Sequence, residues 1–301
     1  MKGTNKSGER EDASVSGKDA KAGQSCMTIT LRHELPAPRR PLVWCTMSRI
    51  LKAAGALVDT IKINALTRED RDGRVFWIKR RTWTARPIMA CANRFFGVAG
   101  NPVVALTDRA AWRDWEVECF LRLHGERYQA FTHGAGAVAA EELPGRNLSQ
   151  HLHDGTLTHS MLAAAARELR RAHQQESAAF LDGIWSHGDP HAGNFVYEEA
   201  TDRARLIDFE VMHHRTMHAG ERHADDLLVL LQDLAGRVSS DQWLPAALAF
   251  LGAYERPEII ARLRQKLVVP GGLGRVWWAV RTTYLGTSEL RRRIAALRGS
   301  I

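Results

Sequence analysis

One short stretch of this chain combines residue types that suit metal-assisted phosphoryl transfer. The segment WSHGDPHAGNFVY, which begins at Trp185, contains His187, Asp189 and, five positions after the aspartate, Asn194. A strand-like run ending in LIDF places Asp208 farther along the chain. If the intervening strands fold back on each other, the two carboxylates come close together. One carboxylate can then orient an acceptor hydroxyl and take its proton, while the other and an amide oxygen hold Mg²⁺ over nucleotide phosphates.

The same residues resemble the protein-kinase-like superfamily, whose catalytic loop reads His-x-Asp-x-x-x-x-Asn and is followed by Asp-Phe-Gly. The sequence looks most like the bacterial lipopolysaccharide core kinases, which act on Kdo and heptose, over about residues 58–226. Aminoglycoside phosphotransferases and RIO-type kinases are more distant relatives. The resemblance implies that Asp189 is the catalytic base and that His187 buttresses the loop. It also implies that Asn194 and Asp208 bind Mg²⁺ and thereby hold ATP.

Two further residues fit the nucleotide site that this resemblance implies. Lys79 ends the apolar run VFWIK and resembles the strand lysine that contacts the inner phosphates. Glu116 opens the core-facing part of an amphipathic helix, as does the glutamate that pairs with that lysine. Glu118 is the alternative, but it lies about 200° around the helix from Glu116 at about 100° per residue. Glu116 is therefore preferred.

The segment AEELPG, residues 140–145, resembles the linker whose backbone amide and carbonyl groups bind adenine in this superfamily. The resemblance therefore adds Glu141, Glu142 and Leu143 to the expected nucleotide contacts. Proline and glycine follow directly, which places the expected boundary between two lobes here.

The phosphate-binding loop departs from the family pattern. No GxGxxG sequence lies between the first strands, and the nearest candidates are AAG from Ala53 and the RDG turn from Arg71. We therefore expect another loop, or basic side chains such as Arg80 and Arg81, to cover the phosphates.

A second departure follows the metal-binding aspartate. The residue after Asp208 and Phe209 is Glu210 instead of glycine, and no Ala-Pro-Glu segment follows. This favours a small-molecule or glycolipid acceptor over a protein acceptor. It also keeps a weakly active or inactive protein as an alternative.

The elements expected around these residues divide the chain into a tail and two lobes. Hydrophobic patterns predict a hairpin of residues 58–66 and 74–81 joined by a polar turn, helices over 88–100 and 110–125, and a strand from 137. After residue 147 the patterns are mainly helical, with strands at 195–200 and 203–210. We predict an α+β, bilobal protein-kinase-like fold, with a small antiparallel-sheet N-lobe that has one main helix and a mostly helical C-lobe. The expected bounds are a disordered polar tail over 1–41, an N-lobe over 42–143 and a C-lobe over 144–301.

Several other residues have expected structural roles, and the role of His191 is left undecided. One of Asp225 and Asp226 is expected to be a buried carboxylate that fixes the catalytic loop. His191 either touches phosphate or acceptor, or satisfies loop carbonyl groups. Five tryptophans alternate with aliphatic residues and are expected in the core: Trp77, Trp112, Trp115, Trp277 and Trp278.

Composition limits the class of protein and of partner. The chain has 301 residues, 45% hydrophobic and 25% charged, which is typical of a globular protein. Its formal net charge of +8 favours an anionic partner. Nucleic acid is not expected, because no nucleic-acid-binding motif accompanies the charge. The four scattered cysteines show neither metal-type spacing nor a disulfide framework, which favours a cytoplasmic location.

Membrane contact is expected to be peripheral at most. The longest nearly uncharged apolar run, LPAALAFLGAY from Leu244, is well short of the ~20 residues that cross a bilayer. The arginine-rich segment over 291–300 could lie against anionic lipid at the inner face of a membrane, although a solvated helix end is preferred.

Taken together, these features predict an ATP- and Mg²⁺-dependent phosphotransferase that acts on a hydroxyl, with an anionic lipopolysaccharide-type sugar or glycolipid as acceptor. Two alternatives stay open. One is a kinase that acts on proteins or on small molecules of the aminoglycoside type, and the other is a nucleotide-binding pseudokinase scaffold without catalysis.

Overall fold

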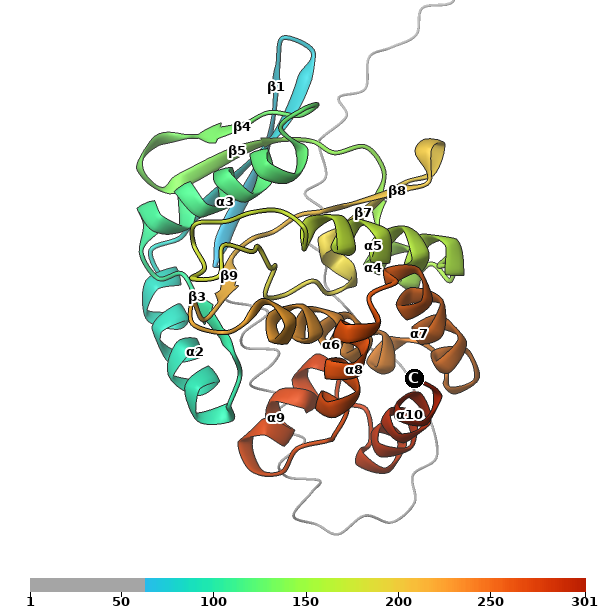
Figure 1. Ribbon diagram of the computed structural model, residues 1–301. Helices are drawn as coiled ribbons and strands as arrows, with labels where there is room; N and C mark the ends of the chain where they lie inside the picture. The colour runs from blue at the N-terminus through green and yellow to red at the C-terminus, as the bar shows by residue number, and fades with distance from the viewer. Residues whose placement is uncertain (1–62) are drawn as a thin grey trace, which may run out of the picture. The chain divides into compact units, whose positions relative to one another are not determined.

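The computed structural model describes residues 63–301 (Figure 1). The expected polar tail over 1–41, the first part of the predicted hairpin and the AAG sequence from Ala53 lie outside the described residues.

An antiparallel sheet and two helices of similar length form the first part of the described chain, so the expected single main helix has a counterpart. The sheet has the order β1-β2-β5-β4 and consists of β1 (Asn64–Arg71), β2 (Arg74–Arg81), β4 (Ala130–Thr132) and β5 (Ala137–Glu141). Helix α3 (Arg109–His124) packs on β4 and β5 through a buried face that includes Trp112, Cys119 and Phe120. Asp108 caps this helix by accepting a hydrogen bond from the amide of Ala111 at 2.8 Å.

The β1–β2 hairpin is present, but its turn is tighter than the sequence predicted. Strand β1 continues through most of the residues expected to form a polar turn, and only Asp72 and Gly73 reverse the chain. Both have left-handed φ angles, 54° and 78°. An Asp-Gly pair adopts this conformation readily, and two such residues suffice to join strands of matching twist.

A second connection joins early and late parts of the chain. Helix α2 (Ala85–Ala99) leads to β3 (Val103–Ala105), which pairs with β9 (Val211–His213). Neither strand was predicted, because three residues are too few to display a periodic pattern. Through this pair, the segment after Asp208 is held beside the chain that enters α3.

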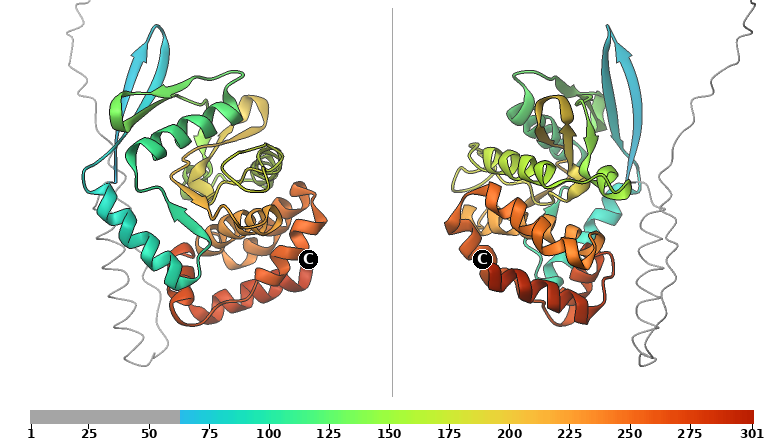
Figure 2. Two further views of the ribbon diagram at one scale, coloured as in Figure 1. Left: turned by 60° about the vertical axis from the view of Figure 1, so that its left-hand side comes forward. Right: turned by 90° about the vertical axis from the view of Figure 1, so that its right-hand side faces the viewer.

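The rest of the described chain is mostly helical (Figure 2). Its helices are α4 (Leu148–His153), α5 (His159–Ala172), α6 (Ala219–Arg237), α7 (Ser240–Tyr254), α8 (Pro257–Lys266), α9 (Gly272–Arg281) and α10 (Thr287–Ser300). A small sheet of β6 (Arg146–Asn147), β7 (Phe195–Glu198) and β8 (Arg203–Leu206) lies among them. Helix α10 buries Leu290, Ile294 and Leu297 and packs on α7. Helix α9 was not predicted.

The predicted α+β class is confirmed, with an antiparallel sheet in the N-terminal part and helices in the C-terminal half. The exact division at residues 143 and 144 stays a prediction. In the part of the chain that the structure covers, no helix has both the length and the apolar character needed to cross a bilayer.

The expectation of a tryptophan core needs one correction. Trp112, Trp115 and Trp278 are buried, but Trp77 is 40% exposed and its side chain donates to Glu142 at 2.9 Å. The alternation of β2 turns Trp77 to the face of the sheet opposite Phe76 and Ile78, which are buried.

Candidate active site

Lys79 lies at the centre of a cluster of carboxylates. Its ammonium group, on β2, is 3.2 Å from Glu116 Oε1 on α3 and 2.8 Å from Glu210 Oε1. It also pairs with Asp208, which follows β8. Glu118, the alternative to Glu116, instead pairs with Arg122 on the outer surface of α3. The structure thus brings Lys79, Glu116 and Asp208 together.

Burial and neighbouring charges shift the pKa values of this cluster in different directions. Burial raises the pKa of Glu116 to about 7, assisted by the negative charges of Asp208 and Glu210 and opposed by Lys79. Burial also acts to lower the pKa of Lys79, but Asp208, Glu116 and Glu210 outweigh it and hold that pKa well above its usual value. Lys79 is therefore charged at any physiological pH, while Glu116 lies near its titration point.

Asp208 adopts a backbone conformation that is uncommon for a residue with a side chain. Its φ angle is 68°, and left-handed conformations cost such a residue on the order of 1 kcal/mol. The next residue, Phe209, is buried and donates its amide hydrogen to Glu116 Oε2 at 3.1 Å. Glu116 thus fixes both Lys79 and the backbone beside Asp208.

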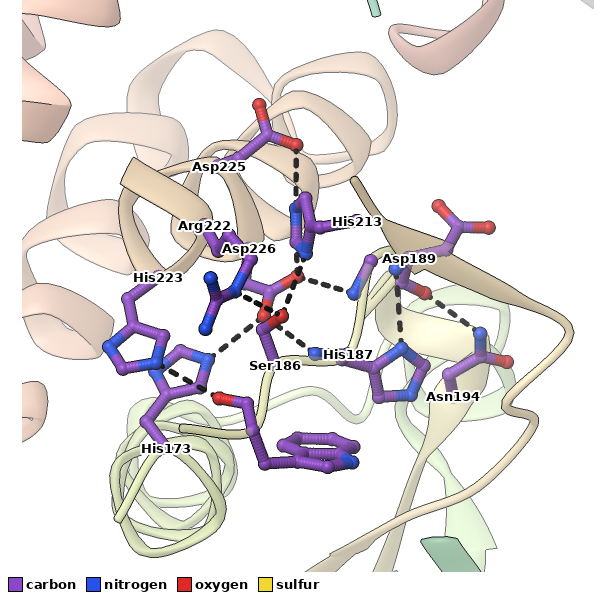
Figure 3. A network of polar contacts seen from close by, with 12 residues as sticks. His173, Ser186, His187, Asp189, Asn194, His213, Arg222, His223, Asp225 and Asp226 are labelled. Carbon is purple, nitrogen blue, oxygen red and sulfur yellow. Dashed lines mark hydrogen bonds and ion pairs between the residues drawn. The ribbon is translucent and has the colours of Figure 1, made fainter. Parts of the chain in front are cut away.

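The loop that carries Asp189 is anchored by a buried carboxylate on α6 (Figure 3). Asp226 accepts hydrogen bonds from the amides of His187 and Gly188, at 2.9 and 2.8 Å, and from His173 at 2.9 Å. Although burial opposes ionisation, the nearby His213 and His173 hold the pKa of Asp226 well below its usual value. Asp226 is thus the buried carboxylate that the sequence led us to expect in this helix.

Further buried polar side chains brace the same loop, and sequence reasoning missed them (Figure 3). His223 donates to the carbonyl of Trp185 at 3.0 Å and stacks on His173 with ring centres 3.8 Å apart. Arg222 and His213 both contact Ser186 Oγ, at 3.1 and 3.0 Å. In the sequence, Arg222 and His223 lie in the polar run ERHADD, which does not distinguish buried from solvent-exposed side chains.

His187 connects the loop to the strand before Asp208. Its Nδ1 accepts from the amide of Asp189 at 3.2 Å, and its Nε2 donates to the carbonyl of Ile207 at 3.1 Å. Burial lowers the pKa of His187, which favours the neutral ring that both contacts require. This geometry agrees with a buttressing role.

Asn194 and Asp208 are brought to the same end of a strand pair. Phe195 of β7 pairs with Leu206 of β8, and the amide of Ile207 donates to the carbonyl of Asn194 at 3.0 Å, so Asp208 is the next residue along. The Asn194 side-chain nitrogen donates to the backbone carbonyl of Asp189 at 2.9 Å. Its amide oxygen points away from that contact (Figure 3). One carboxylate and one amide oxygen are ligands of the kind that suits Mg²⁺.

A cavity of about 890 Å³ lies beside the lysine cluster. Its wall includes Lys79, Glu116 and Asp208, together with the predicted linker residues Glu141, Glu142 and Leu143. The apolar side chains in its lining are Leu66, Val75, Val138, Ala140, Val196 and Ile207, among others. A volume in this range and a mixed lining suit a ligand the size of a nucleotide.

The side chains of the two linker glutamates already bind other residues of the sheet and of the chain beside it. Glu142 pairs with Arg68 at 2.8 Å and accepts from Trp77, and hydrogen bonding to Arg68 lowers its pKa. Glu141 accepts from the amide of Gln129 at 2.9 Å. The backbone amides of Glu141 and Glu142 also donate within the sheet, to the carbonyls of Gln129 and Val75, at 2.8 Å each. Any contact of this linker with a base therefore involves its other backbone groups.

The groups considered as phosphate cover lie in different surroundings. The RDG turn lies at the opposite end of β2 from Lys79, because Arg71 pairs with Arg74 and Leu66 pairs with Lys79. Arg81 is buried, donates to the carbonyl of Leu106 and stacks on Trp112 at 4.5 Å, whereas Arg80 is exposed. The contacts of Arg81 with Leu106 and Trp112 count against it as phosphate cover, whereas Gly73 of the RDG turn lines the cavity, so the group that covers the phosphates stays a prediction.

Asp189 and His191 complete the loop. Asp189 is 38% exposed, and its Oδ1 lies 3.3 Å from Arg281 on α9, a partner that sequence reasoning did not identify. His191 caps the short helix after it by accepting from the amide of Gly193 at 3.0 Å. His191 thus bonds within the loop, but to an amide and not to a carbonyl group, and its contact with phosphate or acceptor stays a prediction.

Comparisons with known proteins give structural matches alone. No family model matches the sequence, and no curated protein matches it. A Plasmodium vivax ethanolamine kinase is similar at a TM-score of 0.41 and 10% identity, over 86% of this chain and 87% of that chain. The ADP-bound aminoglycoside phosphotransferase APH(2'')-Ib is similar at a TM-score of 0.39 and 14% identity, over 82% of this chain and 96% of that chain. A spectinomycin phosphotransferase in complex with ADP and spectinomycin is similar at a TM-score of 0.37 and 12% identity, over 80% of this chain and 86% of that chain. At these TM-scores the likeness assigns neither a substrate nor the predicted lipopolysaccharide kinase branch.

Proposed function

We propose that this chain is a kinase that transfers the γ-phosphoryl group of ATP to a hydroxyl. One observation carries the proposal: in the wall of a nucleotide-sized cavity, Lys79 of the sheet pairs with Glu116 of α3 and with Asp208 after β8. A lysine fixed by a helix glutamate positions nucleotide phosphates, and the carboxylate beside it is suited to holding the metal that they bind.

The residues of this chain have distinct roles in the proposed reaction. Lys79 contacts the phosphates, and backbone groups of residues 141–143 contact the base. Asp189 orients the acceptor hydroxyl and takes its proton as the acceptor oxygen bonds to the γ-phosphorus and the bond to the bridging oxygen of ADP breaks. Asn194 and Asp208 would hold Mg²⁺, which supplies positive charge to the phosphates when bound.

The acceptor in this proposal is a sugar hydroxyl on an anionic glycolipid of the lipopolysaccharide type, which the net charge of +8 favours. A cytoplasmic location, with contact at the inner face of a membrane that carries such an acceptor, belongs to the same proposal. Label transfer from [γ-³²P]ATP separates the acceptor classes, with lipopolysaccharide core oligosaccharide, kanamycin and casein as probes.

A non-catalytic nucleotide-binding scaffold is the second candidate. The observation that favours it is the third carboxylate on Lys79, because Glu210 lies 2.8 Å away where the family pattern has glycine. A lysine already paired three times is less available to phosphate.

The substitution Asp189→Asn tests the catalytic proposal. We expect ATP turnover to fall by about 10²–10⁴-fold, because the amide cannot accept the proton, with ATP affinity within about threefold of the parent. Asp114→Asn is the matched control, since Asp114 is 59% exposed on α3. Equal turnover in the parent and Asp189→Asn contradicts the assignment, and nucleotide binding without turnover in the parent supports the scaffold.

A further inference from the structure

A second cavity adjoins the proposed catalytic base. Its volume is about 290 Å³, and its lining draws on the end of α2 and the residues after it, on α6, and on α8 and α9. Helices α2 and α9 pack against each other along this region (Figure 2). Arg281 lines the cavity and also contacts Asp189 Oδ1 at 3.3 Å, so this space lies directly beside the base.

Two hydrogen-bond donors in the lining have no acceptor. Arg281 Nε and the side-chain nitrogen of Asn101 are buried and make no hydrogen bond within the described part of the chain. Asn101 is 7% exposed, and the side chain of Arg281 is 10% exposed. A guanidinium group can only donate, and a buried donor without an acceptor is costly. Both donors are satisfied by a ligand that brings acceptor oxygens into the cavity.

Cationic and acidic side chains both line this cavity. Arg281 and Lys266 are cationic, and Lys266 pairs with Glu221 at 3.0 Å outside the lining. Asp225 is the acidic residue in the lining, and its carboxylate lies 3.4 Å from His213. Each cation already pairs with a carboxylate, but Arg281 keeps a donor without an acceptor in the described part of the chain. That donor can bind an anionic group, while Asp225 can accept a hydrogen bond from a hydroxyl of the same ligand.

An aromatic ring forms part of the same wall. Trp277 lies beneath the Arg281 guanidinium at 4.7 Å and is held edge-on by Phe96 at 5.0 Å and by Phe95 at 6.2 Å. A ring fixed in this way restricts the guanidinium to the cavity wall. The small volume leaves space for a group about the size of one sugar ring.

We propose that this cavity binds the anionic group, a carboxylate or a phosphate, of a sugar-sized acceptor, so that a hydroxyl of the same molecule reaches Asp189. The link to Asp189 as base rests on the proposed kinase function, whereas the anion site rests on Arg281 and Asn101 alone. Because one guanidinium contacts both Asp189 and the cavity, a bound anion competes with Asp189 for Arg281.

Ligand-observed NMR titrations of the full chain test this site. The anionic probes are glucuronate and glucose 6-phosphate, and the matched probes are neutral methyl glucoside and cationic glucosamine. We expect an anionic probe to bind at least tenfold more tightly than methyl glucoside, and Arg281→Ala to abolish that preference. The two anionic probes distinguish a carboxylate ligand from a phosphate ligand. Arg298→Ala, which removes an exposed arginine of α10, should keep the preference.

Each outcome supports or overturns the inference. It is wrong if methyl glucoside or glucosamine binds as tightly as both anionic probes, or if Arg281→Ala keeps the anionic preference. Should circular dichroism show that Arg281→Ala is unfolded, Asn101→Asp replaces it, because the added negative charge should repel the anionic probes. A thermal-shift measurement with ATP and Mg²⁺ accompanies every titration. Absence of nucleotide binding counts against the proposed kinase function alone, and loss of the anionic preference with intact nucleotide binding counts against this inference alone.

Discussion

At the scale of single residues, Lys79 pairs with three carboxylates, those of Glu116, Asp208 and Glu210. These pairs dominate the electrostatics of the site. The sequence placed Lys79 and Glu116 on the correct elements, because one ends an apolar strand and the other lies on the buried face of a helix. It did not reveal that Glu210 joins them, since a contact between positions 79 and 210 depends on the complete fold. For the same reason, Arg281 beside Asp189 could not be predicted.

The raised pKa of Glu116 predicts how stability depends on pH. The folded state holds a proton on Glu116 up to about pH 7, whereas an unfolded glutamate loses it near the ordinary pKa of 4.5. Because the folded state binds more protons in this interval, the contribution of Glu116 to stability falls as pH rises from about 4.5 to 7, by on the order of 2 kcal/mol. Urea denaturation of the parent and Glu116→Gln should show that this decline is absent from the variant. Glu118→Gln is the control, and an unchanged pH dependence in Glu116→Gln would contradict the assignment.

At the scale of elements, local patterns predicted the hairpin and α3, whereas elements defined by tertiary pairing were missed. Strands β3 and β9 exist because they pair with each other, and α9 begins among glycines that weaken its helical pattern. The bracing of the catalytic loop likewise depends on side chains from α5, α6 and β9 that are distant in sequence.

Asp226 should contribute strongly to the stability of that loop. The substitution Asp226→Asn replaces an acceptor of three hydrogen bonds with a group that also presents donors to the same amides. We expect a loss of about 3–5 kcal/mol in the free energy of unfolding. Asp225→Asn is the matched control and should lose less stability than Asp226→Asn, because the carboxylate of Asp225 has a 3.4 Å contact with His213, whereas that of Asp226 accepts three hydrogen bonds. Similar losses in the two variants would show that Asp226 does not anchor the loop.

The linker after β5 depends on a glycine. Gly145 has a φ of 111°, and a Cβ atom there would lie 2.0 Å from the carbonyl oxygen of Tyr197 on β7. Gly145→Ala should therefore cost about 2–4 kcal/mol and weaken nucleotide binding, since Gly145 lines the larger cavity. Gly97→Ala, at an open position on α2, should instead stabilise the protein by up to about 1 kcal/mol. Chemical denaturation and nucleotide titration measure both effects, and a neutral Gly145→Ala would refute the steric argument.

For the whole molecule, the α+β class followed from the division of patterns along the chain, because strand-like runs precede the linker and long helical runs follow it. Composition and net charge were compatible with many partners. The choice of an anionic sugar acceptor therefore depends on experiment.

Binding of ATP with Mg²⁺ should stabilise the folded chain as a whole. At a nucleotide concentration 100 times the dissociation constant, linkage adds about 2.7 kcal/mol. For a domain of this size that raises the melting temperature by about 5–10 °C. We expect EDTA, or the substitution Asp208→Asn, to remove most of the increase that depends on the metal. An equal increase with and without EDTA would show that Asn194 and Asp208 do not hold a metal.

The fluorescence of Trp77 can report on binding in the larger cavity. Its indole lines the cavity and is hydrogen-bonded to the linker residue Glu142, whereas Trp185 and Trp243 are buried in the interior. Light emission from an indole responds to water and to nearby rings, so an adenine entering between the sheet and the linker should alter the signal of Trp77 while that of the buried indoles stays constant. Occupancy of the proposed nucleotide site can thus be followed without attaching a dye.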